Sequence, residues 1–200
     1  MDGAIFLWFA WIGVVITIFF LKASSERNQL LFVLLIAICL VNLQFNLASY
    51  KFTALFLLSW ITGYGLLLRN MQVKRLYAVI VVIMLTAAYT AIQLFSIYDP
   101  VFTYVYTKWS IAAVLFIIIH LTLTGIGQRT SFVILSIVHG EAILMFLFHQ
   151  MGIARIGGEM ASLDIIAICV MGTIVWNSFV QVTAQMERIV KKHQERRGYS

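Results

Sequence analysis

Seven apolar runs of membrane-spanning length, separated by short polar breaks, divide this chain of 200 residues. The runs cover residues 3–21, 30–50, 52–68, 76–97, 107–127, 131–150 and 161–183. A helix needs about 20 apolar residues to cross the hydrocarbon core of a bilayer, so seven spans use almost the whole chain. We therefore expect an all-α membrane protein, a bundle of seven transmembrane helices in a single domain, with residues 184–200 as a basic tail.

Composition excludes a water-soluble globule, because 62% of the residues are hydrophobic, whereas soluble domains contain about 45–50% apolar residues. The motifs CxxC, HExxH and GxSxG and a Gly-rich phosphate loop are absent from the sequence. We expect no enzymatic activity, no cofactor and no metal site. Nucleic-acid binding is not expected either, because the basic residues are scattered between the spans instead of forming a surface on a folded module.

The Lys and Arg residues predict an orientation, because such residues accumulate in the cytoplasmic loops of membrane proteins. With the N-terminus outside, eleven of the fourteen fall on the cytoplasmic side: Lys22, Arg27, Arg69, Lys74, Arg75, Arg129, Arg188, Lys191, Lys192, Arg196 and Arg197. The other three, Lys51, Lys108 and Arg155, fall outside. The bias predicts a cytoplasmic C-terminus and an odd number of spans. The first run is interpreted as a retained helix, because its basic residues follow it, whereas they precede the apolar core of a signal peptide.

The tail reads QMERIVKKHQERR over residues 185–197 and is expected to continue the last helix into the cytoplasm. Glu187 stands four residues before Lys191, a spacing that supports a helix. The basic residues of the tail would be attracted to anionic lipid headgroups. A docking site for a cytoplasmic protein is the alternative interpretation of the same segment.

Three ionisable residues are predicted to lie at a similar depth near the middle of the membrane. At about 1.5 Å per residue, His139 and Glu141 lie about 12 and 15 Å from the inner end of their helix. His120 lies about 16 Å from the outer end of its own helix, in a core about 30 Å thick. Because His139 and Glu141 are two residues apart on a helix, they cannot face the same neighbour, so at most one of them faces His120.

Two functional interpretations of these residues remain open. They could form a proton relay or ion site, or they could make interhelical hydrogen bonds that fix helix packing. We therefore expect a non-enzymatic packing or partner-binding component, the alternative being a small proton, ion or solute transporter or channel that uses His120 and Glu141. A continuous cavity touching both residues would favour transport. Ligation of haem by His120 and His139 would lack a second ligand pair and an attachment motif.

Further polar and small residues occur inside the runs. Asn42 and Asn46 stand four apart, so on a helix they share a face that could bond to a neighbour or line a wet cavity. Gln93 is expected at a similar depth to Asn46. The pair Ser136 and Gly140 has the spacing that lets two helix backbones approach closely.

The N-terminal sequence Met1-Asp2-Gly3, the segment Trp8-Phe9-Ala10-Trp11-Ile12, the short length and the single basic tail give a family resemblance. The chain resembles the YphA-type small integral membrane proteins of Bacillus and relatives over its whole length. The resemblance implies a multi-pass protein of a Gram-positive plasma membrane. It implies no particular catalytic or binding residue.

Overall fold

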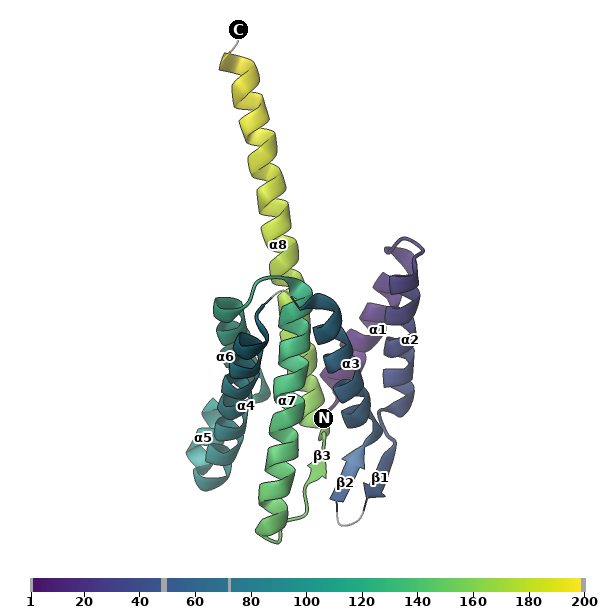
Figure 1. The fold of residues 1–200 in the computed structure, drawn as a ribbon, viewed down its shortest axis with the longest axis vertical. Helices are drawn as coiled ribbons and strands as arrows, with labels where there is room; N and C mark the ends of the chain where they lie inside the picture. Colours follow the sequence, from purple (N-terminus) through teal and green to yellow (C-terminus); the bar gives the residue numbers. More distant parts are fainter. Residues whose placement is uncertain (1, 48–49, 72, 199–200) are drawn as a thin grey trace.

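The computed structural model describes residues 2–47, 50–71 and 73–198 as a bundle of helices with a small sheet at one end (Figure 1). The helices are α1 (Ala4–Phe19), α2 (Ser25–Leu40), α3 (Ala54–Asn70), α4 (Arg75–Tyr98), α5 (Pro100–Val105), α6 (Lys108–Thr122), α7 (Ile126–Gln150) and α8 (Met160–Gly198). The strands are β1 (Gln44–Leu47), β2 (Tyr50–Thr53) and β3 (Ile156–Gly157). Apart from the six-residue α5, each helix corresponds to one of the apolar runs.

The second apolar run is not a helix throughout, so the prediction of a span over residues 30–50 is wrong in its second half. Helix α2 begins earlier, at Ser25, where the Ser24 hydroxyl accepts a hydrogen bond from the backbone N–H of Arg27 at 3.1 Å, and it ends at Leu40. Polar and apolar residues alternate over Asn42–Asn46, and this period of two suits a strand better than a helix.

The predicted all-α class is confirmed for the bundle itself, to which three short strands add a small sheet. Strands β1 and β2 pair antiparallel, with Asn46 opposite Lys51, and β3 adds to β2 in parallel. The Thr53 hydroxyl donates to the carbonyl of Gly158 at 3.0 Å and also accepts from the N–H of Phe56, so it caps α3 while tying it to the end of β3. The sheet therefore closes one end of the bundle, called here the sheet end.

Helix α7 lies at the centre of the bundle and packs against α3, α4, α6 and α8. The predicted close-packing pair is confirmed at its contact with α4. The backbone carbonyl of Ser136 accepts a hydrogen bond from Thr86 at 3.3 Å. A Cβ atom added to Gly140 would lie 2.4 Å from Cδ1 of Tyr89, so even a methyl group would displace the buried Tyr89 ring or α4 itself.

The linkers α1–α2, α3–α4 and α6–α7 lie toward the opposite end of the bundle, from which α8 projects (Figure 1). We call this the tail end. The predicted continuation of the last span is confirmed, since α8 is one helix of 39 residues. The predicted pairing of Glu187 with Lys191 lies outside the side chains that the structure describes.

The outer surface of the bundle is strongly apolar, as expected for a protein surrounded by lipid. Large side chains such as Trp8, Phe19 and Leu121 are 73%, 76% and 82% exposed. Within the described residues, three segments are long and apolar enough to cross a membrane: Arg75–Ser96, Ile126–Gln150 and Met160–Ile189. The apolar helices Ala4–Phe19 and Lys108–Thr122 are shorter, and the count of seven spans stays a prediction.

Candidate functional site

The predicted acidic residue Glu141 lies at the interface of α7 and α4, where its side chain is 1% exposed. Its Oε1 atom accepts two hydrogen bonds, one from the Tyr89 hydroxyl at 2.5 Å and one from Nη2 of Arg155 at 3.0 Å. The Gln93 side chain donates to the Tyr89 hydroxyl at 3.2 Å. These four residues form the Glu141 cluster, which links two long helices to the loop before β3.

Arg155 reaches this position from the short loop between α7 and β3, and its side chain is only 12% exposed. Its guanidinium lies 5.2 Å from the ring centroid of Phe148 and 3.7 Å from the carboxylate of Glu159. A buried carboxylate without a cation is strongly unfavourable in a low-dielectric interior. Arg155 therefore makes the burial of Glu141 tolerable.

A second buried carboxylate, Asp164, lies where the N-termini of α1, α6 and α8 meet. Its Oδ1 accepts from the backbone N–H of Phe6 at 2.9 Å, and its Oδ2 accepts from that of Gly3 at 3.1 Å. Its Oδ2 also accepts from Nζ of Lys108, the first residue of α6, at 2.7 Å. Asp164 lies on α8, yet it caps the N-terminus of α1, because unpaired N–H groups at a helix N-terminus attract an anion. We call this group the Asp164 cluster.

The two predicted histidines face other neighbours. His139 lies against α3, where Nε2 is 3.0 Å from the Tyr64 hydroxyl and Nδ1 is 2.6 Å from the carbonyl of Leu135. Because a carbonyl only accepts, Nδ1 carries the hydrogen, and in the neutral ring Nε2 accepts from Tyr64. His120 donates from Nδ1 to the carbonyl of Phe116 at 2.8 Å and lies beside Trp176 of α8.

The structure does not bring His120, His139 and Glu141 together. His120 faces α8, His139 faces α3 and Glu141 faces α4. The prediction that His139 and Glu141 cannot share a neighbour is therefore confirmed, and neither of them contacts His120. A relay through direct contacts among these three residues has no basis in the structure.

The other predicted polar residues divide into two groups. Gln93 belongs to the Glu141 cluster through its bond to Tyr89. Asn42 and Asn46 do not share a helix face, because Asn42 lies in the turn after α2 and Asn46 lies on β1, and both are exposed. The predicted shared helix face of Asn42 and Asn46 is therefore wrong.

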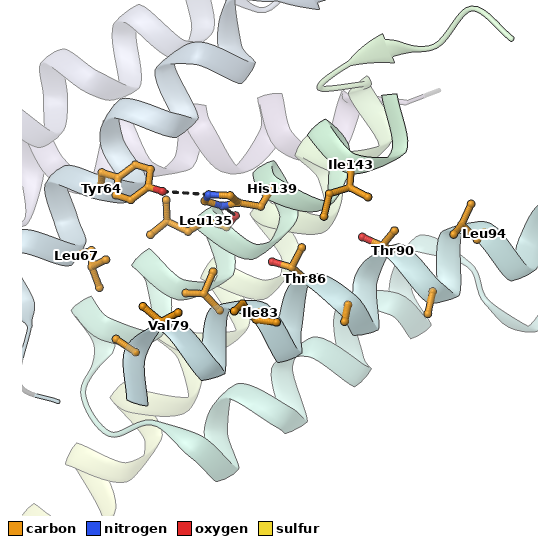
Figure 2. Close-up of a pocket in the computed structure, with 14 residues that line it drawn as sticks. Tyr64, Leu67, Val79, Ile83, Thr86, Thr90, Leu94, Leu135, His139 and Ile143 are labelled. Carbon is orange, nitrogen blue, oxygen red and sulfur yellow. Dashed lines mark hydrogen bonds between the residues drawn. The ribbon is translucent and has the colours of Figure 1, made fainter. Parts of the chain in front are cut away.

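A groove of about 670 Å³ runs between α3, α4 and α7. Figure 2 shows Thr86 and Thr90 of α4 facing the side chains of Tyr64 and His139 across it. The remaining lining is aliphatic: Leu67, Ala78, Val79, Val82, Ile83, Ala87, Ala91, Leu94, Leu135 and Ile143. Glu141 and His120 do not line it. We call this cavity the α3–α4–α7 groove.

Sequence reasoning missed Tyr89, Arg155, Lys108 and Asp164 as partners in buried clusters. Arg155, Lys108 and Asp164 stand near the ends of apolar runs, where charged residues are normally solvated. In the described part of the chain, no three His, Cys, Asp or Glu side chains lie close enough to hold a metal ion.

Comparison with known proteins identifies a family for this chain. No similar protein was found among curated proteins, and none among solved structures. The family model of the YphA-like integral membrane proteins matches residues 2–198. This match agrees with the apolar exterior of the bundle and covers both buried clusters. The chain belongs to the family of YphA-like integral membrane proteins.

Proposed function

We propose that this protein is a non-enzymatic membrane component that binds a partner within the bilayer along the α3–α4–α7 groove. The single observation that carries the proposal is that the carboxylate of Glu141 is bonded inside the protein and is separate from the groove. A transport site would need Glu141 to border a cavity that a solute can enter. In this arrangement the Glu141 and Asp164 clusters hold the helices in place, and the groove offers a surface for binding.

The proposal includes seven spans, an outer N-terminus and a cytoplasmic C-terminus, in the plasma membrane of a Gram-positive bacterium. The sheet end would face outward and the tail end inward, because most Lys and Arg residues belong to the linkers and the helical tail at the tail end. Helices of 15–17 residues, such as α6 and α3, extend only about 22–26 Å. Local thinning of the bilayer would accommodate them. The basic tail would contact anionic lipids.

One observation favours the rival function, proton or ion transport. Oε2 of Glu141 and Nε of Arg155 are buried and have no hydrogen-bond partner in the described structure. Free donor and acceptor atoms on a buried ion pair could take part in proton exchange. This rival is therefore worth a direct test.

We expect wild-type protein, reconstituted into vesicles containing a pH-sensitive dye, to pass protons no faster than vesicles without protein. The variant Glu141→Gln, which removes the titratable carboxyl, should behave in the same way, because Glu141 is enclosed by α4, α7 and Arg155. A protonophore added at the end checks that the vesicles are sealed. Proton flux above that of empty vesicles would refute the proposal, and loss of that flux in Glu141→Gln would assign it to this residue.

A further inference from the structure

We infer that two copies of this chain associate in parallel along an apolar stripe on the part of α8 that projects from the tail end. This stripe, called here the α8 seam, consists of five exposed side chains: Val175, Phe179, Val182, Met186 and Ile189. The inference goes beyond the proposed function and is independent of it, because the seam residues do not line the α3–α4–α7 groove.

Helix α8 is much longer than the bundle to which it belongs. At about 1.5 Å per residue its 39 residues extend about 58 Å, whereas the 25 residues of the central helix α7 extend about 38 Å. Figure 1 shows the excess as the part of α8 that projects from the tail end. Thr173 is still buried, but the side chains from Ile174 to Ile189 are exposed, apart from the half-buried Asn177. Within the described structure, the projecting part therefore packs little against the bundle.

The spacing of the seam residues is typical of a helix that pairs with another helix. Successive seam residues stand 4, 3, 4 and 3 positions apart along the chain. This heptad spacing keeps one stripe facing a partner helix over its whole length. Phe179 and Met186 take the a positions of the heptad, and Val175, Val182 and Ile189 take the d positions. Their exposed fractions of 50–64% show that other parts of the described chain do not cover the stripe.

The seam is most distinct where α8 has left the membrane. About 20 residues are enough to cross the hydrocarbon core, so the stretch from Gln181 to Ile189 lies past it. The large apolar residues of this stretch are Val182, Met186 and Ile189, which all belong to the seam. A projecting helix this short is marginal in water unless an apolar face is packed against a partner. The stretch therefore needs a cover for its seam.

The membrane surface does not provide that cover. Helix α8 runs as one helix, and residues 173–197 contain neither Gly nor Pro. The segment thus lacks the residues that usually produce a sharp kink, and without a kink α8 cannot turn its seam onto the surface. The basic tail can be attracted by anionic headgroups while the seam stays away from them.

A second copy presents the matching seam in the matching direction. Copies with the same topology in one membrane hold their α8 helices parallel, so a positions face a positions and d positions face d positions at the same height. Like charges do not oppose each other along the described part of the seam, because the flanking e and g positions are uncharged there: Trp176, Ser178, Thr183 and Gln185. Glu187 and Arg188 take the outward b and c positions.

The contact area determines where such a pair is stable. Complete burial of an apolar side chain of this kind removes about 60–120 Å² from water. With their exposed fractions, the seams of two copies contribute about 350–700 Å². Stable interfaces between free proteins bury about 1,200–2,000 Å². The pair therefore depends on the bilayer, which holds both copies in parallel and at a high effective concentration.

The test uses the full chain with Cys39→Ala and Cys169→Ala, reconstituted into phosphatidylglycerol vesicles with one introduced cysteine at a time. Copper phenanthroline oxidises two neighbouring thiols to a disulfide, and a gel without reductant measures the cross-linked fraction. We expect cross-linking at the seam, in Val182→Cys, Met186→Cys and Ile189→Cys. Exposed positions off the seam should give only the background of random collisions: Ala184→Cys, Glu187→Cys and Arg188→Cys.

A second pair of variants places a charge on or off the seam. Met186→Lys puts like charges opposite each other at an a position and should reduce cross-linking through Val182→Cys to background. The matched control Gln181→Lys adds the same charge at a c position and should leave this cross-linking intact. Both residues are exposed on the projecting part of α8, so neither change should disturb the bundle.

Three outcomes would overturn the inference. Cross-linking of equal extent on and off the seam would show random collisions, and unchanged cross-linking in Met186→Lys would show that the seam is not the contact. Background levels at all six cysteine positions would mean that copies of this chain do not pair there, and that a different protein covers the seam. None of these outcomes bears on the proposed function, which the proton-flux measurement tests separately.

Discussion

Replacing Arg155 with methionine is expected to lower the free energy of unfolding by about 3–5 kcal/mol, the range for removing one partner of a buried ion pair. The change leaves Glu141, at 1% exposure, with only the Tyr89 hydroxyl as a donor. Methionine keeps an apolar chain of similar length beside Phe148, so the loss reflects charge and hydrogen bonding. Unfolding in mixed micelles of a mild detergent and dodecyl sulfate measures the effect.

Glu141→Gln should destabilise less than Arg155→Met, because the freed guanidinium can move toward Glu159, whereas the freed carboxylate is enclosed. The double variant should recover part of the loss of Arg155→Met. As a matched control, Arg69→Met removes an exposed ion pair with Glu26 and should cost no more than about 1 kcal/mol. Equal losses for Arg155→Met and Arg69→Met would show that the Glu141 cluster does not stabilise the fold.

Replacing Asp164 with alanine is expected to cost about 1.5–3 kcal/mol through the lost hydrogen bond from Lys108, which keeps only the exposed Asp2 at 3.6 Å. It also removes the acceptor for the backbone N–H groups of Gly3 and Phe6, a capping interaction that typically contributes about 1 kcal/mol. Helix α1 should then detach from α8, and the amide protons of Gly3 and Phe6 should exchange faster. Hydrogen exchange read by mass spectrometry resolves this local effect from global unfolding.

Two further variants separate the parts of the Asp164 cluster. Asp164→Asn keeps one acceptor for the α1 cap but loses the charge, so its effect should lie between that of alanine and wild type. Asp2→Asn changes an exposed carboxylate 3.6 Å from Lys108 and should alter stability by no more than about 0.5 kcal/mol. If Asp164→Ala left both stability and exchange at Gly3 unchanged, the capping role would be wrong.

The apolar runs predicted the long helices well, because sustained hydrophobicity determines which segments can be buried or face lipid. The prediction over residues 30–50 is wrong in its second half because it rests on apolar content and not on the alternation of polar and apolar residues. Around Asn42 and Asn46 the period of two indicates a strand, and the structure contains a hairpin there. Length and composition alone do not separate these two outcomes over so short a stretch.

The candidate site could be predicted only in part. Glu141 stands out in the sequence because an acidic residue inside an apolar run is rare, and Gln93 stands out for a similar reason. Their connecting partners were not recognisable: Tyr89 is an ordinary aromatic residue of a membrane helix, and Arg155 stands in a loop. The hydrogen bonds of Glu141 with Tyr89 and Arg155 join α7 to α4 and to that loop. Such tertiary contacts leave no local pattern in a single sequence. Asp164 was missed because the meeting of three helix N-termini is likewise visible only in the fold.

The central claim is that the bundle crosses the membrane an odd number of times. Thiol accessibility in intact cells tests this claim most directly. With Cys39 and Cys169 replaced by alanine, single cysteines are introduced as Asp2→Cys and Arg188→Cys, both at exposed positions. We expect a membrane-impermeant maleimide to label Asp2→Cys in intact cells and Arg188→Cys only after permeabilisation. Labelling of both positions on the same side of the membrane would contradict the seven-span account.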